Sequence, residues 1–306
     1  MALALTTVGV VRNLRSHANR GQSSGAPSGL HWAEPETPQA LVQDMKRFAD
    51  AGVDLLVIDG GDGTVREVLS ALPAAYGDRP PVLAVLASGK TNVLALDLGA
   101  GRGWTLAEVL RRAATDAPSL KSRAPLEVSW TDQPPVRGFI LGLGAFARAT
   151  QMSKAVHRMG AYHSLSVALT LAGAALGTLF DNKASPWRRG IEATVAVDGA
   201  AQPVGQRFVL IVTALKRLPF GLKPFGPPRE GMKVLDVEAP PRGLLSALPV
   251  VLAGRGDGWL AARGYRRALA DRLDLRVDEP IVIDGEVFPG GAISVRLGAP
   301  LRFLVP

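Results

Sequence analysis

Cysteine is absent from the 306-residue chain. Disulfide bonds and thiolate metal sites are therefore excluded, and a protein of the reducing cytoplasm is expected. The chain also lacks a lysine- and arginine-rich run with interleaved aromatic residues, which is the usual pattern of a single-strand nucleic-acid site. We therefore expect no nucleic-acid partner.

The N-terminal segment, residues 1–11, lacks a basic start followed by a long apolar core. That combination is the pattern of a secretory signal peptide, so we interpret the segment as a first strand. Together with the missing cysteine, this favours a cytoplasmic protein.

What the chain does have is a formal net charge of +8. An excess of positive charge suits nucleic acid, an anionic membrane surface or a phosphorylated ligand, and charge alone does not choose among them. Apolar residues make up 47% of the sequence, which is enough to build real cores. The length fits two domains or one large one.

The most informative stretch runs from Leu55 to Leu69. An apolar run breaks at Gly60, Gly61, Asp62 and Gly63, and apolar residues then resume at helical spacing. This predicts a buried strand, a tight loop and a helix. Glycines bring backbone N–H groups close to a guest, and the start of the helix favours negative charge there. A phosphate is the favoured guest, and an ordinary strand-to-helix turn is the alternative.

Similar units lie on both sides of this stretch. Strands are expected at 6–11 and 82–86, each followed by a polar loop, and helices at 37–49, 93–96 and 102–114. Strands that alternate with helices indicate a parallel sheet with its polar loops at one edge, where ligands of such sheets bind. Gly89-Lys90-Thr91 is not expected to be a P-loop, because Ala84 stands in an apolar strand where that motif needs a glycine.

From about residue 124 the pattern changes to short strands separated by turn signals, at 126–130, 137–141, 192–197 and 207–212. Ser164 to Phe180 carries no charge and falls short of the roughly 20 residues that span a bilayer, so a buried helix is favoured over an interfacial one. The loop from Leu215 to Arg229 mixes basic and aromatic residues. It suits either a membrane-surface contact or an irregular structural loop.

Asp284-Gly285-Glu286 lies between apolar residues near the end of the chain. Asp-Gly in such a context is first of all a hairpin turn. Two carboxylates two residues apart in a strand would also share one face, and Glu286 would then suit a general base.

Four stretches together resemble the diacylglycerol kinase catalytic-domain family, which includes bacterial lipid kinases, sphingosine kinases and ceramide kinases. In chain order they are Asn13-Leu14-Arg15-Ser16, Gly60-Gly61-Asp62-Gly63-Thr64, Gly89-Lys90-Thr91-Asn92 and Asp284-Gly285-Glu286. NAD kinases share the second stretch but lack the last. The resemblance implies an α/β nucleotide-binding domain with a parallel sheet at 1–123 and a mainly antiparallel β-sandwich domain for the lipid at 124–297. The last strand, about 298–306, often returns to the first domain in that family.

The implied activity is that of a lipid kinase, with ATP and Mg²⁺ as its cofactors. It transfers the γ-phosphate to a hydroxyl of ceramide, diacylglycerol or a sphingoid base at an anionic membrane surface. Such an enzyme would work at the inner face of the membrane as a peripheral protein. The alternatives are a soluble NAD kinase-like enzyme and a non-catalytic nucleotide- or lipid-binding protein.

The resemblance also implies roles for individual residues. Glu286 is the candidate base, Asp284 is its close alternative, and Asp62 is the catalytic carboxylate that holds the metal. The nucleotide would be bound by Asn13, Ser16, Gly60, Gly61, Asp62, Gly63, Thr64, Gly89, Lys90, Thr91 and Asn92.

Two departures from the family pattern bear on these roles. Lys90 stands where a threonine is common, and Val93 stands where many members have an aspartate that helps the metal network. The metal network is therefore expected to be thinner here. The stretch around Asp236 matches only loosely the segment that binds a structural Mg²⁺ in some bacterial members, so no second metal is predicted.

Overall fold

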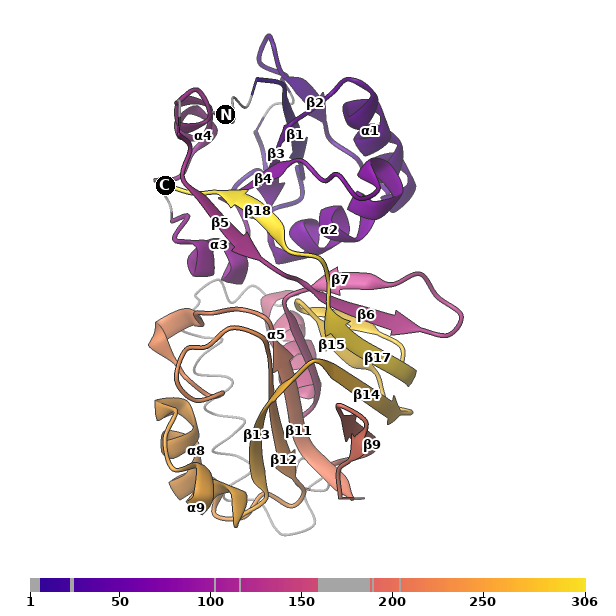
Figure 1. The fold of residues 1–306 in the computed structure, drawn as a ribbon, viewed down its shortest axis with the longest axis vertical. Helices are drawn as coiled ribbons and strands as arrows, with labels where there is room; N and C mark the ends of the chain where they lie inside the picture. Colours follow the sequence, from indigo (N-terminus) through magenta and orange to yellow (C-terminus); the bar gives the residue numbers. More distant parts are fainter. Residues whose placement is uncertain are drawn as a thin grey trace. The chain divides into compact units, whose positions relative to one another are not determined.

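The protein forms two compact units, the first made of Met1–Pro125, Val136–Gly138 and Gly298–Pro306 and the second of Leu126–Pro135 and Phe139–Leu297. The structure, a computed structural model shown in Figure 1, describes residues 6–22, 25–101, 103–115, 117–158, 188, 190–203 and 205–306.

The first unit is an α/β fold. Its strands are β1 (Val8–Arg12), β2 (His31–Ala33), β3 (Leu55–Gly60), β4 (Val82–Ala87), β5 (Leu120–Arg123), β7 (Val136–Gly138) and β18 (Leu301–Leu304). Its helices are α1 (Pro38–Asp50), α2 (Asp62–Tyr76), α3 (Val93–Leu98) and α4 (Leu106–Ala113). Six of these strands form a sheet in the order β2-β1-β3-β4-β18-β5. Only the β18–β5 pair is antiparallel (Figure 1).

The sequence accounts for these elements locally. Leu55–Ile58 of β3 are buried, as strands covered on both faces require. Thr37 caps α1 by accepting a hydrogen bond from the Ala40 N–H at 3.1 Å, and Pro38 occupies its first turn. Parallel order brings the loops after β1, β3 and β4 to one edge of the sheet.

The second unit is a mainly antiparallel β fold. Its strands are β6 (Leu126–Trp130), β8 (Ile140–Gly144), β9 (Ile191–Val197), β10 (Ala200–Ala201), β11 (Gln206–Thr213), β12 (Met232–Glu238), β13 (Tyr265–Ala270), β14 (Arg272–Val277), β15 (Ile281–Ile283), β16 (Glu286–Phe288) and β17 (Gly291–Leu297). Every strand pair recorded among them is antiparallel. The predicted fold class, a parallel α/β domain followed by an antiparallel β domain, is confirmed.

Three α-helices and a short 3₁₀ turn are described in the second unit. They are α5 (Ala145–Arg158), α8 (Leu244–Ala253), α9 (Asp257–Ala261) and the 3₁₀ turn η1 (Pro219–Gly221). The first follows β8 directly, and α8 and α9 lie between β12 and β13 along the chain. In Figure 1 they lie beside β13.

Some predicted boundaries were wrong. The strand expected at 137–141 is two strands, β7 and β8, which belong to different units. The helix expected at 102–114 begins only at Leu106, where Thr105 caps it. Ser164 to Phe180 lies outside the described residues. Within the described part of the chain, no helix has the length and apolar character needed to cross a membrane.

Candidate functional site

Two loops of the first unit touch through their backbones, one after β3 and one after β4. A Cβ atom placed on Gly89 would lie 2.5 Å from the Cα atom of Gly61, which is far inside van der Waals contact. Any side chain at Gly89 would therefore push the loops apart. Glycine is needed here because two backbones approach each other closely. The sequence analysis predicted a close approach of the backbone to a guest and did not predict this contact between the loops.

The start of α2 is open to an anion. Its N-cap residue, Gly61, offers no side-chain oxygen to the first N–H groups of the helix. Those N–H groups have no partner within the helix, and they carry the positive end of its dipole. A Cβ atom on Gly63 would have no other group within 4 Å, so this side of the turn is not filled by the protein. These features are those of a phosphate-binding helix terminus.

Asp62 connects the two loops. Its Oδ1 atom accepts a hydrogen bond of 2.8 Å from the backbone N–H of Val93, the first residue of α3. Burial raises the pKa of the Asp62 carboxyl, and hydrogen bonds from the backbone at Val93, Asn92 and Leu94 oppose that rise. The Asp62 carboxylate, at the start of α2, thus also accepts a hydrogen bond from the start of α3.

The loop after β1 is attached to α2 through Asn13. Its Nδ2 atom donates to Thr64 Oγ1 at 2.8 Å, and its Oδ1 atom accepts from the Arg15 N–H at 2.9 Å. Thr64 is buried over Gly60, where a Cβ atom would collide with it at 2.5 Å. Ser16 is also buried, and its N–H donates to the Asn13 carbonyl. The structure therefore brings Asn13, Gly60 and Thr64 together as predicted neighbours.

Asp59 is the residue that the sequence analysis missed. Ser88 Oγ donates to its Oδ1 at 2.5 Å, and Asn19 Nδ2 donates to the same oxygen at 3.1 Å. Arg12 Nε lies 3.4 Å from its Oδ2. One carboxylate therefore joins all three loops at this sheet edge. The available signal was an acidic residue at the end of an otherwise apolar strand.

Asn92 holds the second loop in shape. Its Oδ1 atom accepts from the Gly89 N–H at 2.8 Å, while Nδ2 donates to the Gly89 carbonyl at 2.7 Å. Its backbone is left-handed, with φ of 51°, which asparagine tolerates better than most residues. Lys90 and Thr91 are exposed at the tip of this loop. Of the three predicted ligands Lys90, Thr91 and Asn92, the first two are therefore accessible to a ligand from solution.

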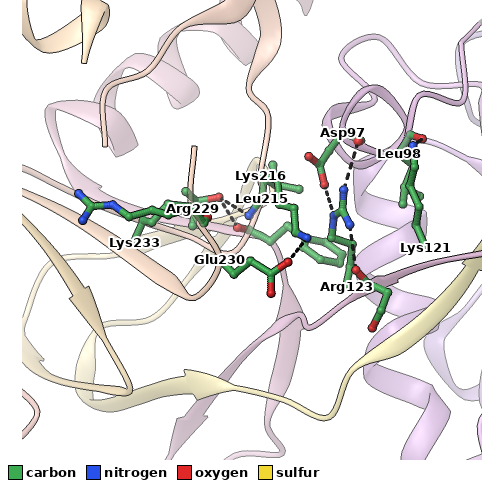
Figure 2. Close-up of polar contacts among 12 residues, drawn as sticks. Asp97, Leu98, Lys121, Arg123, Leu215, Lys216, Arg229, Glu230 and Lys233 are labelled. Atoms are coloured by element: carbon green, nitrogen blue, oxygen red, sulfur yellow. Dashed lines mark hydrogen bonds and ion pairs between the residues drawn. The ribbon is translucent and has the colours of Figure 1, made fainter. Parts of the chain in front are cut away.

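A buried ion pair fixes α3 beneath the second loop. Arg123 Nε lies 2.5 Å from Asp97 Oδ2, and both side chains are almost fully buried. Figure 2 shows this contact. Lys121 Nζ donates to the Leu98 carbonyl at the end of the same helix at 2.6 Å. Together these contacts attach the C-terminal end of α3 to β5. The N-terminal end of α3 is bound by Asp62.

A divalent cation needs several oxygen ligands, which protein side chains, substrate phosphates and water can supply. Within the described residues, no group of three or more histidine, cysteine, aspartate or glutamate side chains could hold a metal ion. Mg²⁺ in nucleotide sites is usually bound by one or two carboxylates together with substrate phosphates and water. Asp62, half-buried beside the open helix terminus, fits that smaller requirement.

The late carboxylates lie in the second unit, in the hairpin of β15 and β16. Asp284 and Gly285 both have positive φ, 45° and 84°, so they form the turn itself. Asp284 Oδ1 accepts from the N–H groups of Phe139 and Ile140 at 3.1 and 2.9 Å. This carboxylate therefore anchors the hairpin to the start of β8.

Glu286 is the first residue of β16, and its side chain is exposed. The expectation that Asp284 and Glu286 share one strand face was wrong, because Asp284 lies in the turn with left-handed backbone. The hairpin interpretation of Asp-Gly is the one that holds. Glu286 is exposed, whereas Asp284 is half-buried.

Residues 21–120 match the family model of the diacylglycerol kinase catalytic domain. The matched region contains Asp59, Asp62 and the second loop, and it lies within the first unit. None of the curated protein sequences matches the chain.

Solved structures extend the similarity over the whole chain. A diacylglycerol kinase from Bacillus anthracis str. Sterne matches with a TM-score of 0.64 at 14% identity, covering 98% of this chain and 97% of that one. Two other solved structures from the same organism, both named provisionally as diacylglycerol kinases, match at TM-scores of 0.70 and 0.67 with the same identity and coverage. At this identity the structures show a shared two-unit fold.

The family match and the shared fold together confirm the resemblance to the diacylglycerol kinase catalytic-domain family. The match over residues 21–120 supports a lipid kinase family.

Proposed function

We propose that this protein is an ATP-dependent lipid kinase that transfers the γ-phosphate to a hydroxyl of a membrane lipid, either ceramide, diacylglycerol or a sphingoid base. The observation that carries the proposal is the start of α2, which has no side-chain cap and is joined to the second loop through Asp62 and Val93. A helix terminus open to phosphate, held by two glycine loops, suits the nucleotide of a kinase.

The residues of the first unit would act mainly by positioning. The N–H groups of Gly63 and Thr64 would donate to phosphate oxygens, and the exposed Lys90 would add a positive charge. Asp62 would hold Mg²⁺, which supplies neutralisation of the phosphate charge when it is bound with the nucleotide. Asp59 would keep the three loops in register without touching the nucleotide.

For the acceptor hydroxyl, the proposal assigns the base to Glu286. Glu286 is an exposed residue, and both oxygens of Asp284 accept hydrogen bonds from backbone N–H groups. A carboxylate that already accepts such hydrogen bonds is a poorer proton acceptor, because they stabilise its charged form. Asp284 is thus proposed as a structural residue of the hairpin.

Action at an anionic membrane surface is part of the same proposal. The net charge of +8 favours a negatively charged surface. The loop from Leu215 to Arg229 exposes Phe220, whose side chain is 89% accessible, close to several basic residues. The protein would then act as a cytoplasmic, peripheral enzyme at the inner face of the membrane.

The test is a transfer assay with γ-labelled ATP and Mg²⁺. Mixed micelles containing ceramide, diacylglycerol or sphingosine are incubated in parallel with a reaction that contains NAD instead. The proposal expects label in at least one lipid. Label in NAD alone would make the protein an NAD kinase-like enzyme, and bound ATP without any transfer would make it a non-catalytic binding protein.

A further inference from the structure

One helix of the second unit is apolar on every side. The sequence of α8, Leu244 to Ala253, contains no charged residue, and Ser246 is its one polar residue. A helix at the surface of a soluble protein normally has one apolar face and one polar face. Helices that are apolar all round are otherwise found in the cores of large proteins or in contact with lipid.

The inner face of α8 is already covered. Ala247 and Val251 are buried in a cluster with residues of the neighbouring loop, strands and α9, namely Phe225, Leu235, Val237, Leu260 and Tyr265. The opposite face carries Leu245, which is 65% accessible, and Leu248, which is 39% accessible. The apolar character of α8 is therefore explained on one side only.

A neighbouring loop extends this exposed face. The Lys223 N–H donates to the Leu252 carbonyl of α8 at 2.9 Å, so the 3₁₀ turn η1 and the residues after it are attached to the end of the helix. Phe220 in that turn has a left-handed backbone, with φ of 59°, and a highly exposed ring. A bulky residue in this conformation is strained, and such strain is typical of functional segments. Leu222 is exposed beside it.

The charges at the two ends of α8 are positive. Arg242 and Arg255 lie on either side of α8 and are exposed. Asp257 is the only acidic residue between 239 and 267, and Arg267 Nη1 neutralises it at 2.5 Å. Among the described residues, no carboxylate pairs with Arg242 or Arg255. An apolar face with arginines at both ends matches the chemistry of an anionic lipid surface.

We propose that the outer face of α8, together with Phe220 and Leu222, docks on an anionic phospholipid bilayer. The apolar side chains enter the interface, while Arg242 and Arg255 contact phosphate groups. A second copy of the chain fits less well, because a symmetric pair would bring the arginines of both copies together. This inference rests on the proposed function, because a lipid kinase must reach its substrate in the membrane. Docking itself requires no catalysis.

The test measures co-sedimentation of the full chain with vesicles, without nucleotide or lipid substrate. Vesicles of phosphatidylcholine with 30% phosphatidylglycerol are compared with vesicles of phosphatidylcholine alone. We expect preferential binding to the anionic vesicles. The double variant Leu245→Gln/Leu248→Gln should weaken that binding at least about tenfold, because the apolar surface of two leucines is no longer transferred from water into the bilayer. Arg242→Gln should weaken it by about fivefold and reduce its salt dependence.

The control is Leu269→Gln, at a leucine on β13 of the same unit that is 44% accessible, and this variant should bind vesicles as the wild type does. Circular dichroism establishes that each variant is folded. Equal binding by the folded double variant and the wild type would overturn the proposal. Absence of wild-type binding would also overturn it, as would a wild-type dimer that the double variant converts to a monomer.

These outcomes are separate from those of the kinase assay. Phosphorylation of a short-chain diacylglycerol below its micelle concentration needs no bilayer. Activity there without vesicle binding would overturn docking alone, whereas vesicle binding without transfer to any lipid would overturn the proposed function alone.

Discussion

The backbone N–H of Val93 donates a 2.8 Å hydrogen bond to Asp62 Oδ1, so the first residue of α3 is bound to the carboxylate at the start of α2. Many members of the resembled family have an aspartate at the position of Val93. Here that position contributes its backbone, which orients the Asp62 carboxylate instead of adding a second one. The proposed metal site therefore depends on Asp62 more than in relatives with two carboxylates.

Asp62→Asn should remove phosphoryl transfer and keep the fold. Asparagine retains an acceptor for the Val93 N–H, but it has no charge to offer Mg²⁺. We expect kcat to fall by about a hundred- to a thousandfold, the scale of losing a key electrostatic group. The measurement is lipid phosphorylation together with thermal unfolding. Near-normal turnover in this variant would remove Asp62 from the metal site.

The same substitution should change how stability depends on pH. Burial raises the pKa of Asp62 above its ordinary value of 3.8. At a pH between this ordinary pKa and the raised pKa of the folded state, the folded protein therefore binds more protons than the unfolded protein. The stability that this group contributes is present below about pH 4 and is lost as pH rises through the folded pKa. Asp62→Asn has no such loss. Urea unfolding across this range should show the variant gaining stability relative to the wild type as pH rises.

Gly89→Ala and Gly63→Ala should have opposite effects on stability. The added methyl group at Gly89 meets the Gly61 backbone, so we expect a loss of about 1–3 kcal/mol and weaker ATP binding. The added methyl group at Gly63 meets nothing, and alanine is favoured over glycine in a helix by up to about 1 kcal/mol. Urea unfolding checks both values. Similar losses in both variants would contradict the close contact of the two loops.

Asp284 and Glu286 should separate into a structural and a catalytic residue. Asp284→Ala leaves the N–H groups of Phe139 and Ile140 without their acceptor and should cost about 1–3 kcal/mol of stability. Glu286→Gln should cost less stability than Asp284→Ala and should lower kcat with little change in ATP affinity, because a base acts on the acceptor. Unfolding curves and steady-state kinetics of both variants are the measurements. Normal kcat in Glu286→Gln would move the base elsewhere.

The Asp97–Arg123 pair should matter more for stability than the surface pair of Arg111 and Glu108. Arg123→Met leaves a buried carboxylate without its partner and should cost about 3–5 kcal/mol. Arg111→Met, at an exposed pair on α4, should leave the unfolding midpoint unchanged. The double variant Asp97→Leu/Arg123→Met should recover much of the loss. No recovery would indicate that packing, and not the buried charge, sets the cost.

The sequence predicted those parts of the fold that depend on local patterns. The change of period at Gly60 located β3 and α2, and Thr37-Pro38 located the start of α1. It missed Asp59, because contacts with Ser88 and Arg12 arise only when three strands come together. It placed Asp284 in a strand face as well as in a turn, and only the observed backbone decides between these. No helix was predicted at residues 244–253, so α8 and its exposed face were both missed.

The most direct measurement is the transfer of label from γ-labelled ATP to lipid in mixed micelles, with wild type and Asp62→Asn compared in the same experiment. We expect a labelled lipid in the wild-type reaction and none above background with the variant, although both proteins are folded. This expectation would be contradicted by a wild-type protein that labels no lipid, or by equal labelling with the wild type and the variant.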